Sequence, residues 1–262
     1  MSTTLEPLNT LITQTSGLIR QAKCVVALTG AGVSTPSGIP DFRSQGSGLW
    51  TKYLPMEVAS LSTFRTNPEL FYTWLHPLAS HMLLAKPNAA HHALADLEHE
   101  GFLQTIITQN IDALHRRGGA RHVLEIHGTL NTLTCVGCFR QYASDGIIED
   151  YIDNMTIPRC RVCNAILKPD VILYEEQLPM RIWLQAEEAC KTCDLMLVAG
   201  TSLEVMPSAR LPVDALEHGA KLVIINHTPT YVDVRADVIL RGDVAQILPQ
   251  LTSEVLRGTI RQ

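Results

Sequence analysis

Apolar and polar positions alternate along the chain as short apolar runs and longer amphipathic segments. The short runs have the length and character of strands, and strands buried on both faces are typical of parallel sheets. They occupy residues 24–28, 102–107, 123–126, 171–173, 195–198, 222–225 and 238–240. Apolar residues at helical spacing predict helices at residues 8–19, 68–85, 91–98, 179–190, 208–218 and 244–251. This alternation predicts an α/β fold with a doubly wound, parallel, Rossmann-like sheet and right-handed crossovers.

Two segments interrupt the alternation, residues 44–86 and residues 131–167. The first contains a helix that begins at Asn67-Pro68, and the second contains a cluster of cysteines. We expect these two segments to form a smaller inserted domain, made of a helical part and a metal-binding module. Residues 1–43, 87–130 and 168–262 then form the sheet domain.

A glycine-rich turn follows the first strand-like run, with the sequence TGAGVSTPSGIPDFR at residues 29–43. Gly30 and Gly32 allow the backbone to turn sharply and to approach a pyrophosphate, and Ser34 offers a hydroxyl group to phosphate or ribose. An ordinary strand-to-helix turn is the alternative interpretation. The spacing also differs from Gly-x-Gly-x-x-Gly, since position 35 is Thr35.

The end of this turn places an acid, an aromatic ring and a guanidinium on consecutive positions, Asp41, Phe42 and Arg43. That combination favours a ligand-binding loop. Residues 44–53, which are rich in Gly and Ser, are predicted to form a mobile loop of the kind that closes over ligands.

Polar side chains follow two further predicted strands. Gln109, Asn110 and Asp112 come directly after residues 102–107, and His127 follows residues 123–126. Ligands of open α/β sheets bind beyond the carboxyl ends of the strands, which is where these side chains are expected. His127 therefore differs from the other histidines, several of which are predicted to lie on helices.

Four cysteines form two Cys-x-x-Cys pairs, Cys135 with Cys138 and Cys160 with Cys163. Two such pairs supply four thiolates in two knuckles, the donor set of tetrahedral zinc. Four unrelated buried thiols would be the alternative, and this spacing disfavours it. Because no position is left for water, we predict one Zn²⁺ ion with a structural role.

Composition places the chain among ordinary globular proteins, with 262 residues, 46% hydrophobic residues and a net charge of -5. This negative net charge does not suggest a basic surface for nucleic acid, so no direct nucleic-acid binding is expected. No apolar run reaches the length of a membrane span, and the first residues lack a secretory pattern. A cytoplasmic protein is therefore expected, with its cysteines as thiols or metal ligands. The further pair Cys190 and Cys193 is interpreted as packing.

Several motifs in order resemble the sirtuins, the NAD-dependent protein-lysine deacylases. They are GAGVS, GIPDFR, TQNIDALH, the His-Gly of EIHG, the two Cys-x-x-Cys pairs, GTSLEVMPS and the Ile-Asn of VIINHT. Together these motifs extend over nearly the whole chain. The resemblance implies NAD as a co-substrate and an acyl-lysine protein or peptide as the partner, and it leaves the oligomeric state open.

The resemblance also assigns roles to individual residues. His127 would be the general base, Asn110 and Asp112 would line the nicotinamide pocket, and Phe42 would shield the reacting ribose. The NAD-binding set would be Gly30, Ala31, Gly32, Ser34, Asp41, Phe42, Arg43, Gln109, Asn110, Asp112, Gly200, Thr201, Ser202, Asn226, Asp243 and Val244.

The implied reaction transfers the acyl group from lysine to ADP-ribose and moves no hydride. The acyl oxygen attacks the ribose carbon that bears nicotinamide, and His127 assists deprotonation of a ribose hydroxyl. An ordinary imidazole pKa near ~6.5 suits this role at neutral pH. The products would be free lysine, nicotinamide and O-acyl-ADP-ribose.

Two positions depart from the pattern of related enzymes. Glu175 stands where many sirtuins have glycine, in a segment expected to pair with the substrate peptide as a strand. Leu75 and Leu78 stand where sirtuins that prefer acidic acyl groups carry Tyr and Arg. Neutral acyl groups, acetyl above all, are therefore expected as substrates.

The sequence also suggests alternatives from other functional classes. A mono-ADP-ribosyltransferase would use the same NAD site and pass ADP-ribose to a protein nucleophile. A dehydrogenase is disfavoured, because no acid stands about 20 residues after Gly32 at the end of a second strand. A zinc-ribbon module for nucleic acid is disfavoured by the acidic balance.

Overall fold

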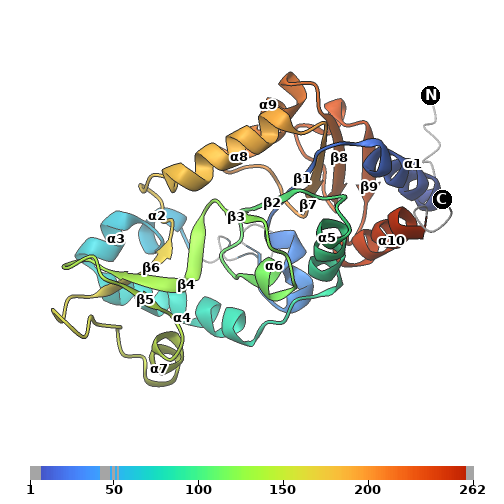
Figure 1. The fold of residues 1–262 in the computed structure, drawn as a ribbon. Coiled ribbons are helices and arrows are strands. Elements are labelled where there is room, and N and C mark those ends of the chain that lie inside the picture. The colour runs from blue at the N-terminus through green and yellow to red at the C-terminus, as the bar shows by residue number, and fades with distance from the viewer. Residues whose placement is uncertain (1–6, 42–47, 49–50, 52, 258–262) are drawn as a thin grey trace.

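The computed structural model describes residues 7–41, 48, 51 and 53–257. Within this part of the chain, six strands form one sheet in the order β3-β2-β1-β7-β8-β9 (Figure 1). All five neighbouring pairs are parallel, as predicted. The strands are β1 (Val25–Thr29), β2 (Thr105–Thr108), β3 (Val123–Glu125), β7 (Leu195–Ala199), β8 (Lys221–Asn226) and β9 (Val238–Arg241).

Helices cover both faces of this sheet, and alternate strand residues pack against each layer. Val25 and Ala27 of β1 contribute to a core with α1 (Leu8–Gln21), α5 (Ala89–His99) and α10 (Val244–Arg257). Val26 and Leu28 contribute to the opposite core, with α8 (Met180–Thr192) and α9 (Leu211–Glu217). Burial on both faces explains why β1 and β7 are apolar at every position but Thr29.

A smaller unit packs beside the sheet domain and has a core of its own. Its three-stranded antiparallel sheet has the order β5-β4-β6, with β4 (Gly128–Cys135), β5 (Gln141–Ala143) and β6 (Leu167–Val171). Its helices are α2 (Pro55–Val58), α3 (Leu61–Thr66), α4 (Pro68–Leu84) and α7 (Ile147–Asn154). Asn67 begins α4 as predicted, since its side chain accepts the backbone N–H of Leu70 at 3.2 Å.

Three local predictions differ from the structure. Strand β2 begins only at Thr105, because Phe102 and Leu103 still close the end of α5 through their bonds to Leu97 O. The turn after β1 continues as two 3-10 turns, η1 (Ala31–Val33) and η2 (Thr35–Ser37), and not as the helix of the alternative strand-to-helix interpretation.

The third difference concerns the strand predicted at residues 171–173. It ends at Val171 and pairs with β4 of the small sheet. Burial alternates along β6, as expected for a strand with one face on a core. We therefore propose that the chain re-enters the sheet domain just after β6 rather than at residue 168, and that it leaves this domain at the start of β4 rather than after residue 130.

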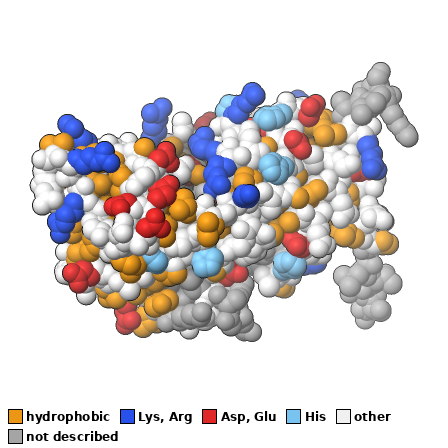
Figure 2. All heavy atoms as spheres, turned by 90° about the horizontal axis from the view of Figure 1, so that it is seen from below, with side chains coloured by type: hydrophobic (Ala, Val, Ile, Leu, Met, Phe, Trp, Pro, Cys, Tyr) orange, Lys and Arg blue, Asp and Glu red, His pale blue; other side chains and the backbone are white. Residues whose placement is uncertain are grey.

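Among the described residues, no helix is both long enough and apolar enough to cross a bilayer. On the face drawn in Figure 2, basic and acidic side chains are interspersed.

Candidate functional site

A cavity of about 890 Å³ opens beyond the carboxyl ends of the central strands. Its walls come from the turn after β1, the segments after β2, β7 and β8, and the first residues of α10. Most of the residues predicted to bind NAD line it: Gly30, Ala31, Gly32, Asp41, Gln109, Asn110, Gly200, Thr201, Ser202, Asn226, Asp243 and Val244. Phe42 and Arg43 lie outside the described residues, as does most of the loop predicted at residues 44–53.

The glycines of this wall permit a close approach of two loops. The backbone N–H of Gly32 donates to Gly200 O at 2.8 Å, and a Cβ on Gly32 would meet the Gly200 backbone at 2.9 Å. Gly200 itself has a φ of +61°. The tight packing between the loops after β1 and β7 therefore requires glycine, in addition to any need for phosphate access.

A second cavity, of about 310 Å³, lies between the sheet domain and the small unit. Its walls are largely apolar and include Trp74, Leu75, Leu78 and Met82 of α4. Leu75 and Leu78 are also buried, so both serve the small-unit core and the cavity wall. Phe71, by contrast, is fully buried in that core.

The two cavities share one wall. Five residues line both of them: Ala31, Gln109, Asn110, His127 and Val205. A nucleotide in the larger cavity and an apolar group in the smaller one would therefore meet beside His127.

His127 is partly buried, and its Nδ1 lies 3.0 Å from the carbonyl oxygen of Gln109. A carbonyl oxygen can only accept, so the ring nitrogen must carry a proton and donate it. In the neutral imidazole the other nitrogen, Nε2, then carries a lone pair in place of a proton. The backbone of Gln109 thus fixes the tautomer that a general base requires.

Ser34, Asn110 and Asp112 form a buried polar cluster on the wall of the smaller cavity. The Ser34 hydroxyl is 1% exposed and donates to Asp112 Oδ2 at 2.6 Å. The Asn110 amide donates to Ser34 Oγ and to Gly30 O, both at 3.1 Å. The Ser34 hydroxyl, expected from the sequence to face phosphate or ribose, is thus engaged in orienting Asp112.

Burial raises the pKa of Asp112, while hydrogen bonds from Ser34 and from the Leu114 backbone N–H oppose this shift. Both bonds stabilise the charged form of the carboxylate. The cluster therefore holds a nearly buried acceptor, and its state of protonation depends on its neighbours.

Two buried histidines lie behind this cluster, with the His91 and His115 ring centroids 4.9 Å apart. The Asn88 N–H donates to His91 Nδ1, so in the neutral ring Nε2 bears the proton and lies 3.5 Å from Ser34 Oγ. Burial lowers the pKa of His91 to about 4 and that of His115 to about 3. Both rings are therefore neutral at physiological pH.

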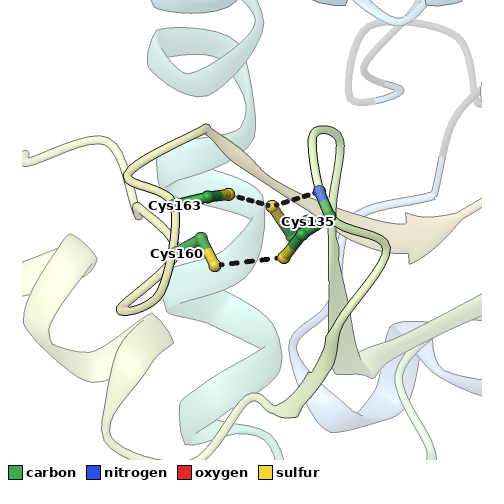
Figure 3. A group of neighbouring side chains, drawn as sticks. Cys135, Cys160 and Cys163 are labelled. Carbon is green, nitrogen blue, oxygen red and sulfur yellow. Dashed lines mark hydrogen bonds between the residues drawn. The ribbon is translucent and has the colours of Figure 1, made fainter.

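Four cysteine sulfurs gather at one end of the small unit (Figure 3). The Sγ atoms of Cys135, Cys138, Cys160 and Cys163 all lie within 4.8 Å of one another. Backbone N–H groups of Gly137 and Val162 lie 3.3 and 3.4 Å from the sulfurs of Cys135 and Cys160. This all-thiol donor set fits a closed tetrahedral metal site, with no position left for a substrate.

The remaining pair, Cys190 and Cys193, is buried against the sheet in the core beneath α8. The packing interpretation of this pair is confirmed. The sequence did not single out several other residues that line the larger cavity, among them Thr35, Glu204 and Thr228. Each of the three lies in a stretch quoted above, Thr35 in TGAGVSTPSGIPDFR, Glu204 in GTSLEVMPS and Thr228 in VIINHT, so these motifs could have drawn attention to them.

Comparison with known proteins identifies the family. Residues 30–207 match the model of the Sir2 family. The chain belongs to the Sir2 family. The sirtuin resemblance inferred from the motifs is thereby confirmed.

Relatives and solved structures of sirtuins match along almost their whole length. The NAD-dependent protein deacylase 2 of Archaeoglobus fulgidus is 43% identical over 94% of this chain and 96% of its own. A Sir2 structure solved to study mechanism and regulation has 42% identity and a TM-score of 0.88, covering 95% of this chain and 99% of that one.

A further Sir2 structure has 37% identity and a TM-score of 0.87, covering 93% of this chain and 98% of that one. It holds a deacetylated p53 peptide and 3′-O-acetyl-ADP-ribose.

Proposed function

We propose that this sirtuin is an NAD-dependent protein-lysine deacylase, with acetyl as its preferred acyl group. Its products are the free lysine, nicotinamide and O-acyl-ADP-ribose. The observation that carries the proposal is the meeting of a polar, glycine-walled cavity and an apolar cavity at His127. A protein with this arrangement can bring a dinucleotide and an acyl-lysine together at one histidine.

The larger cavity is the proposed NAD site. The glycine-rich turn lets phosphate groups approach the backbone closely, and Arg43 is the proposed cationic partner of those phosphates. The Gln109 amide donates to Thr201 Oγ1 at 3.0 Å, and the Asn226 amide donates to the carbonyl oxygens of Thr201 and Thr228. These bonds hold the loops after β2, β7 and β8 together and so fix the walls of the site.

The Ser34–Asn110–Asp112 cluster is the proposed nicotinamide pocket. A carboxylate in a nearly buried position can accept hydrogen bonds from the N–H₂ group of a carboxamide. Bound NAD supplies a ribose carbon that is open to attack and nicotinamide as the leaving group. Asp112, oriented by its own donors, would hold that leaving group in place.

His127 is the proposed general base. With Nδ1–H bound to Gln109 O, its Nε2 can take a proton from a ribose hydroxyl at the junction of the cavities. The apolar cavity holds the acyl-lysine and excludes water from the same point. Nothing in this arrangement requires a metal, and the four-cysteine cluster is proposed to hold one Zn²⁺ ion for folding alone.

The proposed partner is an acyl-lysine peptide that lies as a strand between residues 171–176 and residues 202–207. Segments of both ranges line the apolar cavity, which supports this path. We also propose a cytoplasmic, reducing location, since all seven cysteines are free thiols and the metal site needs thiols.

The test is mass spectrometry of an acetyl-lysine peptide incubated with the protein, with and without NAD. We expect loss of acetyl that requires NAD, with an equal amount of O-acetyl-ADP-ribose. His127→Ala should abolish this reaction. The control His218→Ala, which removes an exposed histidine, should leave it intact. NAD consumption with ADP-ribose on protein and an unchanged peptide would support an ADP-ribosyltransferase instead.

A further inference from the structure

Glu175 occupies an unusual backbone conformation at the mouth of the apolar cavity. Its φ is +73°, in the left-handed region that favours glycine, and the residue lines the cavity. A side chain other than glycine there strains the backbone, so its presence needs compensating contacts.

The Glu175 carboxylate provides these contacts by binding the start of helix α3. Its Oε2 accepts the backbone N–H of Ser62 at 2.8 Å, and its Oε1 accepts the Ser62 hydroxyl at 3.1 Å. Ser62 is the second residue of α3, whose first N–H groups have no partner within the helix. The side chain of Glu175 thus caps α3 from a segment more than a hundred residues away in the chain.

Backbone bonds reinforce the same connection. The N–H of Leu61 donates to Tyr174 O, and the N–H of Tyr174 donates to Ala59 O, both at 3.0 Å. Residues 59–61 and 174–175 therefore lie side by side, and Ala59, Tyr174 and Glu175 all line the cavity. Together these residues form one continuous section of the cavity mouth.

The adjacent residue Glu176 fixes this section from the other side. Its Oε2 lies 2.8 Å from Lys168 Nζ and accepts the backbone N–H of Leu173 at 2.8 Å. The segment between β6 and residue 176 is thereby attached to the small sheet at one end and to α3 at the other. Residues 173–176 thus have little freedom to change their position relative to α3.

We propose that Glu175 is a positioning residue for the acyl-lysine. By binding the start of α3 it holds residues 173–175 at the spacing from Ala59 that admits the substrate lysine into the apolar cavity. Glu175 acts through the shape of the cavity mouth and needs no contact with the reacting atoms. This inference rests on the proposed deacylase function, because it takes the apolar cavity as the acyl-lysine site.

Two variants separate the hydrogen bonds from the charge. Glu175→Gly keeps the backbone conformation and removes both acceptors, whereas Glu175→Gln keeps an acceptor for the Ser62 N–H and removes the charge. Glu149→Gln is the matched control, because the Glu149 carboxylate also accepts an N–H at a helix start, that of Gly146 just before α7, away from the cavity.

The measurements are the KM for an acetyl-lysine peptide, the KM for NAD, and the affinity for the labelled peptide by fluorescence anisotropy. We expect Glu175→Gly to raise the peptide KM and Kd about fivefold to tenfold and to leave the KM for NAD unchanged, as the loss of hydrogen bonds to a charged group implies. Glu175→Gln and Glu149→Gln should remain within about twofold of the wild type.

Two results would overturn the inference. The first is an unchanged peptide KM and Kd for Glu175→Gly. The second is an equal loss of peptide affinity in Glu175→Gly and Glu175→Gln that occurs only with peptides carrying Lys or Arg beside the acyl-lysine. That result would mean that Glu175 selects peptides by their charge. A third result would separate the inference from the proposed function. If the wild type has no deacylase activity but binds the peptide more tightly than Glu175→Gly does, the proposed function is refuted and this inference stands.

Discussion

The hydroxyl oxygen of Ser34 lies 2.6 Å from Oδ2 of Asp112, and this contact joins the turn after β1 to the segment after β2. Asp112 is 8% exposed, and burial is the main cause of its raised pKa. The Ser34 hydroxyl opposes that shift because it donates to the charged form. The proposed nicotinamide pocket therefore depends on a residue of the glycine-rich turn for the charge of its carboxylate.

Ser34→Ala should make catalysis more sensitive to acid. Without the hydroxyl donor the pKa of Asp112 rises further, and the protonated form, which accepts fewer hydrogen bonds, persists to higher pH. The acid limb of kcat/KM for NAD should move to higher pH, with about a fivefold to tenfold loss at mildly acidic pH. Profiles of kcat/KM against pH test this, with Ser16→Ala in α1 as the control for loss of a buried hydroxyl.

Gly32→Ala should loosen the junction between the loops after β1 and β7. The added methyl group would meet the Gly200 backbone at 2.9 Å, so the loops must separate. We expect a loss of about 1–3 kcal/mol in the free energy of unfolding and weaker NAD binding, measured by urea denaturation and by calorimetry. Gly17→Ala in α1 has open space around the new methyl group and should stabilise the protein by up to about 1 kcal/mol. Equal effects of the two substitutions would contradict this account.

Cys163→Ser should release the metal and destabilise the small unit. Elemental analysis is expected to find one equivalent of zinc in the wild type and little in the variant. Removal of a ligand should lower the melting temperature by roughly 10 °C or more, because the binding energy of a structural metal contributes to folding. Cys24→Ser, at a thiol outside the cluster, is the control. A metal-free wild type with the same melting temperature would refute the structural role.

The apolar cavity should reject an acidic acyl group. Its described lining contains no Lys or Arg, whereas Asp112, Glu175 and Glu176 contribute carboxylates. Burial of an unpaired succinyl carboxylate costs several kcal/mol, so an acetylated peptide should react at least about tenfold faster than its succinylated form. A butyrylated peptide is the control, because its acyl chain has the same length without the charge. Faster turnover of the succinylated peptide would show that a cation reaches the cavity.

Acid should destabilise the fold through the buried histidines. In the unfolded chain His115 gains a proton near pH 6.5, whereas burial lowers its pKa in the folded protein to about 3. The stability contribution is therefore complete above pH 6.5 and is lost as the pH falls toward 3, and His91 acts in the same direction. His115→Gln should reduce the fall in melting temperature between pH 7 and pH 5, whereas His218→Gln should not. Parallel melting curves for all three proteins would contradict this.

The sequence alone determined the strand-helix alternation, the two cysteine pairs and the polar residues that follow the central strands. These features are local, because a strand buried on both faces is apolar at nearly every position and a metal knuckle needs only neighbouring cysteines. Gln109, Asn110 and His127 could be placed at one edge because parallel strands end on the same side of a sheet.

Only the tertiary structure decided which distant segments meet. The pairing of β6 with β4, the turn of the Ser34 hydroxyl toward Asp112 and the double role of Leu75 and Leu78 depend on contacts between segments far apart in the chain. A local sequence pattern indicates whether a residue is buried or polar, but it does not identify the distant residue that this residue contacts. The left-handed backbone at Glu175 is the clearest case, because the helix start that compensates its strain lies in another part of the chain.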